Sequence, residues 1–454
     1  MARGDEDTTL SGLAERASAL VLAAQRAGAD MADTIVARGR SLSVSVRNGR
    51  LEDNQSSEGD QLGLRVFVGR RSAIVSSSDC APGGFAALAE RAVAMARLAP
   101  DDAFAGLADP ADLAGGETTD LDLYDPSIVD AVQLEAEALE AEAAALAIKG
   151  VTASGGAHAS HGSYGAVLAT SAGFSGVYQR SSFSRSVTAI AGEGTAMHRD
   201  GDMSVKIARA DLEAPASIGR LAGERAAAGL NARKLPTQRI PVIFDRRVSS
   251  SLAGHLAAAV NGASIARKTS FLLGKIGAKL FADGVVIEDD PLRRKGLRSR
   301  PFDDEGVQSR RLKLIDDGIL QSYLLDSATA RELNLQTTGH ASRGSGSAPS
   351  PSPSNITLHN GQRSPREMMR DLGKGLLVTQ LIGSGVNLVT GDYSRGCWGF
   401  WFENGEIVAP VAEITIAGHL STMFAALEPA NDLEMKFSTN APSCYVGDMT
   451  LGGL

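Results

Sequence analysis

The chain has 454 residues, too many for one ordinary core, and carries a formal net charge of −8. This acidic balance argues against a nucleic-acid-binding surface, because phosphate binding needs clustered Lys and Arg. No apolar run approaches the ~20 residues that cross a bilayer, residues 1–17 do not form a secretory signal, and three distant cysteines suit a reducing compartment. We therefore expect a multidomain cytoplasmic protein that binds neither nucleic acid nor membranes.

Two similar units are predicted in the N-terminal half, 1–100 and 126–232, joined by an acidic linker at 101–125. Helical spacing of apolar residues marks helices, and alternation of apolar with polar residues marks strands. The first unit contains a helix over 9–29, strand-like stretches over 33–53 and 62–79, and a helix over 84–98. The second contains a helix over 126–147, strand-like runs within 165–194, and a helix over 214–232. Because this order occurs twice, we expect two related α+β units with antiparallel sheet.

The C-terminal half, 236–454, is predicted to be mostly antiparallel β-structure. Two prolines and a change to β-branched residues mark its start within 233–245. Residue pairs that favour two-residue hairpin turns occur twice here and once in the first unit. These pairs are Asn48-Gly49, Asp317-Gly318 and Asn404-Gly405. The Gly-, Ser- and Pro-rich stretch 339–355 is interpreted as a loop that is mobile or covers a groove. The predicted fold class is α+β.

Few local patterns point to a complete catalytic set. The sequence has no G-x-S-x-G elbow and no phosphate-binding loop, and the glycines of 192–202 are interpreted as turn residues. His158 and His161 stand in a Gly- and Ser-rich segment without helical period, which predicts a surface loop in preference to a metal site. The basic run 293–300 is interpreted as a solvated turn.

Two further groups of reactive side chains leave alternatives open. Cys397 is either a nucleophile or, as we favour, a small apolar residue that fills space beside Trp398. Asp303, Asp304 and Glu305 precede a predicted strand. Clustered carboxylates bind Ca²⁺ or perform acid–base chemistry, but turn formation explains Asp and Gly equally well. Composition and spacing alone therefore give an α+β protein without a complete catalytic set.

The C-terminal half carries segments that resemble a known family. "TTGHA" (337–341), "GDYSRG" (391–396), "ENGEI" (403–407) and "PVAEITIAG" (410–418) occur in order along the chain. This succession is similar to that of the TldD/PmbA metallopeptidases, which are also called modulators of DNA gyrase. The resemblance covers nearly all of 236–454 and extends more loosely to the N-terminal half.

The resemblance implies a cytoplasmic zinc peptidase built from TldD and TldE (PmbA) subunits, which trims unfolded peptides. TldD carries an H-E-x-x-x-H motif and a C-terminal cysteine that hold the zinc, and its glutamate activates a metal-bound water. In this chain "SSLAGH" places Ser250 at the first histidine, Ser251 at the glutamate and His255 at the second histidine. Serine is a poor Zn²⁺ ligand and a poor base. The chain therefore resembles the TldE (PmbA) side, with no catalytic residues and no cofactor of its own.

We expect this chain to shape a peptide cavity together with a TldD-like subunit that supplies zinc; a homodimer in the absence of that partner is left open. Unfolded peptides are the expected substrates, and strand addition to an exposed sheet edge is one route for their entry. His255 is interpreted as a helix residue near the subunit interface or the cavity. The residues expected to contact peptide or partner are His255, His340, Asp392, Tyr393 and Arg395.

Two alternatives stay open. The chain is a peptidase in its own right if His255 joins other side chains in an atypical metal site. Candidates for that site are His340, Cys444, Asp303, Asp304 and Glu305. His340 ranks first among them, because a histidine at the start of a mobile loop is accessible; Cys444 lies outside the glycine-rich context of the TldD cysteine. In the second alternative the chain is a non-enzymatic modulator that binds DNA gyrase or another protein.

Overall fold

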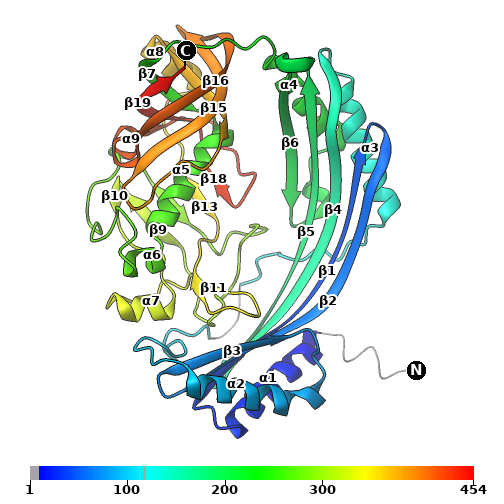
Figure 1. Cartoon of the computed structure of the whole chain (residues 1–454), viewed down its shortest axis with the longest axis vertical. Coiled ribbons are helices and arrows are strands. Elements are labelled where there is room, and N and C mark those ends of the chain that lie inside the picture. Colours follow the sequence, from blue (N-terminus) through cyan, green and yellow to red (C-terminus); the bar gives the residue numbers. More distant parts are fainter. Residues whose placement is uncertain (1–9, 116–118, 454) are drawn as a thin grey trace.

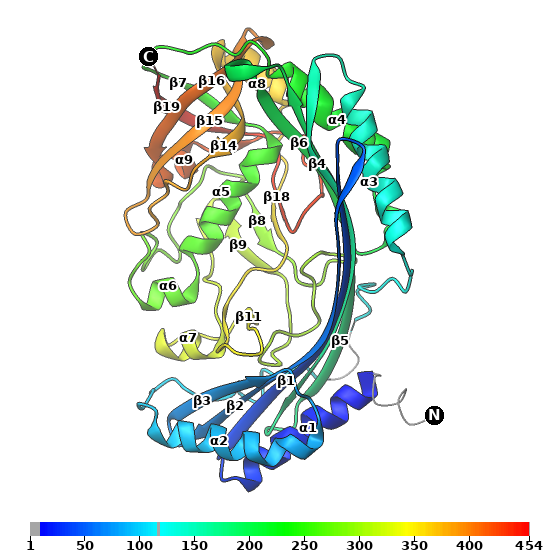
Figure 2. The same ribbon diagram turned by 45° about the vertical axis from the view of Figure 1, so that its right-hand side comes forward.

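A computed structural model describes residues 10–115 and 119–453 of the chain. Residues 1–9, on which part of the secretory-signal prediction rests, and residues 116–118 of the predicted linker lie outside the described residues. The N-terminal half forms a long curved sheet, and the C-terminal half lies against its concave face (Figure 1, Figure 2). Helices combine with mostly antiparallel strands, so the predicted α+β class is confirmed.

One six-stranded antiparallel sheet combines the strands of both N-terminal units. Its order is β3-β2-β1-β4-β5-β6. The strands are β1 (Met31–Arg47), β2 (Arg50–Val68), β3 (Arg71–Ser77), β4 (Val151–Thr170), β5 (Ser175–Ala191) and β6 (His198–Lys206). The two units meet where β1 pairs with β4, from Asp33 opposite Thr170 to Val46 opposite Ala157. This pairing makes them one continuous structure.

Two pairs of helices cover the convex face of this sheet, one pair near each end (Figure 2). They are α1 (Leu10–Arg26) with α2 (Phe85–Leu98), and α3 (Ala131–Leu146) with α4 (Pro215–Ala228). Alternation along β1 turns apolar side chains such as Val36 and Val44 toward the helices. A capping box at Asp130 starts α3. The convex face therefore holds two separate cores, and the concave face is left for the C-terminal half.

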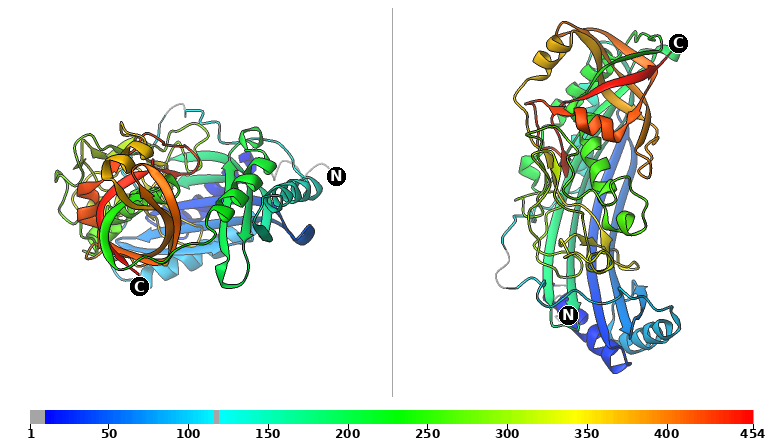
Figure 3. Two further views of the ribbon diagram at one scale, coloured as in Figure 1. Left: turned by 90° about the horizontal axis from the view of Figure 1, so that it is seen from above. Right: turned by 90° about the vertical axis from the view of Figure 1, so that its left-hand side faces the viewer.

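Much of the C-terminal half is a five-stranded barrel. Its β16 strand pairs with β15 on one side and with β19 on the other, which closes the sheet into the ring seen from above in Figure 3. The barrel strands are β7 (Gln238–Phe244), β14 (Lys374–Ile382), β15 (Asp392–Glu403), β16 (Glu406–His419) and β19 (Cys444–Gly452). In the described barrel β7 and β14 are the one parallel pair, so the expected antiparallel character holds.

A smaller sheet with the order β10-β9-β8-β13-β18 completes the β-structure. Its strands are β8 (Ile287–Asp289), β9 (Leu312–Asp316), β10 (Ile319–Leu320), β13 (Ile356–Leu358) and β18 (Thr439–Asn440). The other short strands are β11 (Ala341–Ser342), β12 (Ser350–Pro351) and β17 (Glu428–Pro429). The helices of this half are α5 (Arg246–Ala259), α6 (Gly262–Ala266), α7 (Ser327–Glu332), α8 (Pro365–Leu372) and α9 (Leu420–Ala426). Among the described residues, no helix is long and apolar enough to cross a membrane.

The predicted two-residue turns are present between β1 and β2, β9 and β10, and β15 and β16. Each turn residue has a positive φ, in the pairs Asn48-Gly49, Asp317-Gly318 and Asn404-Gly405. Two-residue hairpin turns of type I′ require this left-handed backbone at both central positions, and Asn, Asp and Gly tolerate it best. Local chemistry alone therefore places these three hairpins.

A buried ion network fastens the C-terminal half to the sheet. Asp33 of β1 is 1% exposed and accepts hydrogen bonds from Arg65 of β2 (2.5 Å) and from Arg343 of the Gly-, Ser- and Pro-rich segment (2.6 Å). Burial raises the pKa of Asp33, but the charges of Arg343 and Arg65 outweigh burial and hold this pKa below its usual range. A Cβ at Gly63 would lie 2.0 Å from the Ser345 carbonyl oxygen. The segment is therefore packed as a cover on β1 and β2.

Replacing Asp33 by Asn should destabilise the protein by about 3–5 kcal/mol, because the buried guanidinium groups of Arg65 and Arg343 lose the carboxylate that they share. Chemical unfolding followed by circular dichroism at neutral pH measures the change. Asp283→Asn removes an exposed carboxylate from an ion pair with Lys279 and is the matched control, for which we expect no measurable change. Equal unfolding midpoints for Asp33→Asn and the wild type would contradict this account of the network.

The same carboxylate makes stability depend on acid pH. The pKa of Asp33 in the folded protein lies below the unfolded value of about 3.9. Its contribution is therefore complete above the unfolded pKa and is lost as pH falls through the folded one. The difference in unfolding free energy between wild type and Asp33→Asn should stay constant from neutral pH down to about 5 and shrink below about 4.

Candidate functional site

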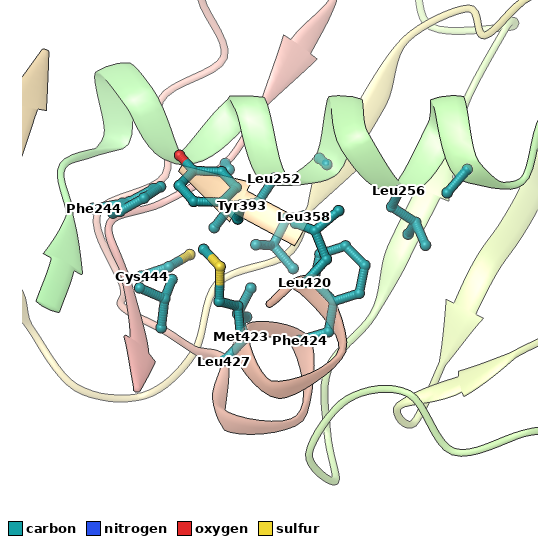
Figure 4. Packing of buried hydrophobic residues seen from close by; sticks show 14 of the residues in the cluster. Phe244, Leu252, Leu256, Leu358, Tyr393, Leu420, Met423, Phe424, Leu427 and Cys444 are labelled. Carbon is teal, nitrogen blue, oxygen red and sulfur yellow. The ribbon is translucent and has the colours of Figure 1, made fainter. Parts of the chain in front are cut away.

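Helix α5 lies between the core of the C-terminal half and the concave face of the sheet. It follows β7 directly, and the Asp245 side chain caps it by accepting a hydrogen bond from the Arg247 backbone N–H (2.9 Å). Leu252 and Leu256 are buried in the core of the C-terminal half, where Tyr393 lies beside the helix (Figure 4). The helical period turns the remaining residues in other directions. One helix therefore presents both an apolar core face and a polar face.

The three motif positions on α5 do not share one environment. Ser250 lines a cavity between the helix and the sheet. Ser251 donates a hydrogen bond to the carbonyl oxygen of Val248 on its own helix (2.5 Å). His255 packs edge-on against Tyr393, with 6.0 Å between the ring centroids. Because positions five apart differ by about 140° around an α-helix, Ser250 and His255 face different sides.

His255 is neutral at physiological pH. Burial, and after it the positive charge of Arg395, lowers the pKa of His255 to about 4. Within the described residues, its Nε2 atom and the hydroxyl of Tyr393 are buried without a hydrogen-bond partner. A divalent cation bound at the ring would meet the charge of Arg395, which opposes metal binding there.

The cysteines of the C-terminal half are free and buried. The Cys444 thiol is fully buried and donates a hydrogen bond to the carbonyl oxygen of Pro442 (3.2 Å), and burial raises its pKa. Burial also raises the pKa of Cys397, in the same core, to about 12. Neutral buried thiols are inert. Cys397 therefore fills space in the core, which is the interpretation that the sequence favoured.

These side chains do not fit a zinc ion. Structural and catalytic zinc sites gather three or four protein ligands about 2.0–2.3 Å from one point. Here Ser250 faces the cavity, His255 faces Tyr393, and the Cys444 thiol bonds a backbone carbonyl. In the ranges 10–115 and 119–453, no group of three or more His, Cys, Asp or Glu side chains is placed to hold a metal ion. The geometry offers no support for an atypical metal site around His255.

His340 is buried, and the expectation that it is accessible is wrong. Its Nδ1 atom lies 2.8 Å from the Thr338 carbonyl oxygen, and its Nε2 atom lies 3.5 Å from the carboxylate of Asp289. The physical reason is that the following segment folds back through the β11–β12 pair and the Arg343 ion pair, and so covers its own first residues. His340 supports the packing of this segment.

The carboxylates of "FDDEG" form a turn. Asp303 Oδ1 accepts hydrogen bonds from the backbone N–H groups of Glu305 and Val307 (2.9 Å each), and Asp304 Oδ2 accepts one from the backbone N–H of Arg343 (2.9 Å). Burial raises the pKa of both Asp303 and Glu305, and the charge of Glu305 adds to the effect on Asp303. Of the two alternatives left open, the structure shows turn formation.

His158 and His161 lie in strand β4, so the surface-loop interpretation is wrong. Their segment pairs with both β1 and β5. Gly and Ser are rare in strands, but pairing on both sides overrides this weak preference. Residues three apart on a strand point to opposite faces, and His161 stacks on Phe183 at 4.5 Å within the convex-side packing. The two imidazoles therefore cannot share a ligand.

The remaining predicted contact residues lie at the start of β15. Asp392 is exposed and accepts a hydrogen bond from the hydroxyl of Thr390 (2.6 Å). Arg395 is half-buried, and its Nε donates to the carbonyl oxygen of Ile382 (3.2 Å). Tyr393 between them is buried in the core. Asp392 and Arg395 are thus the two that stay open to a partner.

A cavity of about 630 Å³ lies between the sheet and the C-terminal half. Strands β5 and β6 form one wall, and α5, β14 and residues 434–441 form the other. This space, here called the interdomain cavity, has a volume typical of ligand sites. The residues that define it include Ser186, Asp200, Arg247, Ser250, Gln380 and Lys436.

Charges in the interdomain cavity are largely paired across its walls. Asp200 of β6 accepts a hydrogen bond from Arg247 of α5 (3.1 Å). Asp202 accepts hydrogen bonds from Arg225 of α4 and from Lys436 (2.9 Å each). The described lining contains hydroxyl groups but neither His nor Cys. Such walls can hydrogen-bond a polar chain, but they lack a nucleophile with its base.

A second chamber of about 290 Å³ adjoins the interdomain cavity and shares Asp200 and Arg247 with it. His198 lies tilted against Trp398 in its wall, with ring centroids 4.5 Å apart. Burial lowers the pKa of His198, which favours the neutral ring. The chamber therefore offers an aromatic surface beside the interdomain cavity.

The charged residues that line the interdomain cavity were not predicted from the sequence. Gly192 and Gly194 lie in a turn with positive φ, as expected, but β6 begins at His198, includes Gly201, and carries Asp200 and Asp202 at alternate positions. That period-two spacing was the available signal. The cations that pair with them come from distant parts of the chain, so only the fold brings them together.

Three domain models of one family match most of the chain. Domain 1 of the PmbA/TldA metallopeptidases matches residues 32–96, the central domain matches 122–230, and the C-terminal domain matches 237–453.

Similar proteins carry related names. A relative from Escherichia coli O157:H7 named metalloprotease PmbA is 38% identical over 433 residues, which are 93% of this chain and 92% of that protein. A solved structure from Bacteroides thetaiotaomicron, described as a modulator of DNA gyrase, has a TM-score of 0.88 and 26% identity, covering 97% of this chain and 98% of that one. TldE from Thermococcus kodakarensis shares the fold, with a TM-score of 0.86 and 20% identity over 96% of this chain and 100% of that one.

An NMR titration of the His255 ring tests the site geometry. We expect its signals to stay constant from about pH 8 to 6 and to titrate near pH 4, because burial and Arg395 disfavour the imidazolium ion. Since this pKa lies below the unfolded value of about 6.5, His255 lowers stability as pH falls from about 6.5 toward 4.

Two variants support the assignment. His255→Gln identifies the signal by removing it, and Arg395→Gln should raise the pKa of His255 only partly toward about 6.5, because burial is the larger cause. An ordinary pKa for His255 in the wild type would contradict its placement against Tyr393.

Proposed function

The chain belongs to the PmbA/TldA metallopeptidase family, and from this membership we propose that it is the PmbA/TldE-like subunit of a cytoplasmic zinc peptidase. In this proposal the zinc and the catalytic motif belong to a TldD-like partner, and this chain shapes the cavity that takes up unfolded peptides. The reaction is hydrolysis of peptide bonds, and this chain contributes binding.

The polar face of α5 is the observation that carries the proposal. Ser250 and Ser251 stand where the family motif has a histidine and a glutamate. One serine hydroxyl is turned to the cavity and the other is bonded within the helix, while His255 packs against Tyr393. The helix therefore keeps its structural role, and the groups that would hold a metal or activate water are missing from it.

The interdomain cavity supports a role in peptide binding. Its walls combine the hydroxyls of Ser186 and Ser250 with the amide of Gln380 and several charged groups. An extended peptide exposes its backbone N–H and C=O groups, which such side chains can satisfy. The adjoining chamber with Trp398 offers an apolar surface for one side chain of the bound peptide.

Metal analysis of the purified chain tests whether zinc and catalysis belong to the partner subunit. Without a partner, the chain should contain no stoichiometric zinc and show no peptidase activity, because α5 lacks the ligand and the base. Co-expression with a TldD-like subunit should give a complex with both zinc and activity. Elemental analysis and hydrolysis of an unfolded peptide measure the two properties.

His255→Gln is the matched variant for this experiment. It should leave the zinc content and the activity of the complex unchanged, because His255 faces Tyr393. Stoichiometric, tightly held zinc with peptidase activity in the chain alone would overturn the proposal. Loss of that zinc in His255→Gln would then favour a stand-alone enzyme.

Filling the interdomain cavity should weaken peptide binding. Ser250→Trp places an indole in a space of about 630 Å³, so the complex should show a raised KM for an unfolded peptide with its zinc content unchanged. Ser421→Trp adds the same side chain at an exposed position of α9 and should have no effect. An unchanged KM in a folded Ser250→Trp complex would move the peptide site elsewhere.

A further inference from the structure

The concave face of the sheet carries a groove outside the interdomain cavity. Strand register places small and polar residues in two rows across β2, β1, β4 and β5. One row is Gly59, Gly39, Tyr164 and Arg180, and the next is Ser57, Ser41, Gly162 and Ser182. Together they line a groove of about 570 Å³. Because most of these side chains are small, the backbone of the sheet is accessible along the groove.

The groove opens at one end into a pocket of about 200 Å³, with which it shares Tyr164 and Arg180. The opposite wall of this pocket comes from the C-terminal half and includes Arg298, Arg300 and Asp304. Three guanidinium groups thus face one carboxylate, so the pocket is positively charged. We call this space, between Arg180, Arg298 and Arg300, the arginine pocket.

The guanidinium groups are held in place by backbone carbonyl groups, and only Arg300 is paired within the described lining, at 3.9 Å from the carboxylate of Asp304. Arg180 Nη2 donates to the Ser299 carbonyl oxygen and Arg300 Nη1 to the Ala341 carbonyl oxygen, both at 2.7 Å. In the part of the chain that the structure describes, the Nε atoms of Arg180 and Arg300 are buried without a hydrogen-bond partner. Burial lowers the pKa of Arg180, and the charges of Arg300 and Arg298 lower it further. Crowded cations of this kind favour an anionic ligand.

We propose that the arginine pocket binds a carboxylate of the peptide that enters the interdomain cavity. Guanidinium groups recognise carboxylates through paired N–H donors. The pocket continues into the groove, so the carboxylate belongs to a chain that lies along the sheet. The rings of Tyr164 and Tyr178, with centroids 6.1 Å apart, form an aromatic wall of the pocket beside the charged groups.

Strand β5 links the arginine pocket to the interdomain cavity. Its alternate residues from Arg180 to Ser186 point to the concave face, and Ser186 lines the cavity. Six residues of extended strand span about 20 Å, which is the length of a short extended peptide. This inference rests on the proposed function, because it names the group recognised on the same peptide: its C-terminal carboxylate or an acidic side chain.

Binding of labelled peptides to the full chain, measured by fluorescence polarisation, tests the inference. The probes are short Ala- and Ser-containing peptides with a free C-terminus, with an amidated C-terminus, and with an amidated C-terminus plus a central Glu. Amidation should weaken binding about tenfold, because a charge-assisted hydrogen bond is lost. Recovery of affinity by the central Glu would assign the pocket to acidic side chains, and no recovery would assign it to the C-terminus.

Arg298→Gln is the variant of choice, because Arg298 is exposed and the one hydrogen bond of its side chain to the described residues is long, 3.4 Å to the Pro353 carbonyl oxygen. It should weaken binding of the carboxylate-bearing peptide about tenfold and leave the amidated peptide unaffected. Arg294→Gln changes the same charge in the same basic run outside the pocket and should have no effect.

The outcomes separate this inference from the proposed function. Equal affinity for free-acid, amidated and Glu-containing peptides would overturn the carboxylate site while peptide binding itself stands. No binding of any probe would overturn both. Displacement of the free-acid peptide by inorganic phosphate at equal concentration would assign the pocket to free oxyanions and overturn the peptide carboxylate.

Discussion

The antiparallel pairing of β1 with β4 is the interaction on which the rest of the structure depends. Each N-terminal unit contributes three strands, and this one ladder joins them into a sheet long enough to curve around the C-terminal half (Figure 2). Because side chains alternate between faces, the register also decides which residues meet the helices and which line the concave face. Asp33, Gly39 and Arg180 face the C-terminal half for this reason, and a slip of one residue on its strand would turn each to the convex side.

Charged contacts hold the two halves of the molecule together at separate places. At one end Asp33 pairs with Arg343, and at the other Asp200 pairs with Arg247 across the interdomain cavity. Apolar packing between the halves is local, around Phe302 and where His198 lies against Trp398. Buried ion pairs need defined geometry and position groups more than they add net stability. The space between the anchoring points is bordered by charged and hydroxyl side chains, which can hydrogen-bond the backbone of an extended peptide.

Local features of the fold were predictable because few residues determine them. Turn pairs such as Asn404-Gly405 tolerate positive φ wherever they occur, and helical spacing located the four N-terminal helices within a few residues. The surroundings of a side chain were not predictable where segments distant in sequence determine them. Pairing on both sides places His158 in a strand, and the segment that folds back over His340 buries it. Likewise Arg298, in a run that resembles a solvated turn, lines a pocket because β5 lies opposite.

The sequence by itself determined the α+β class, the hairpin turns, the family resemblance, and the replacement of two motif residues by Ser250 and Ser251. These depend on residue types and short spacings, which folding does not change. Only the tertiary structure decided that Ser250 faces a cavity while His255 faces Tyr393, and that three arginines share one pocket. The physical reason is that burial and charge at a side chain depend on which strands and helices surround it. Those neighbours come from distant segments, such as Tyr393 beside His255 and Arg298 opposite Arg180.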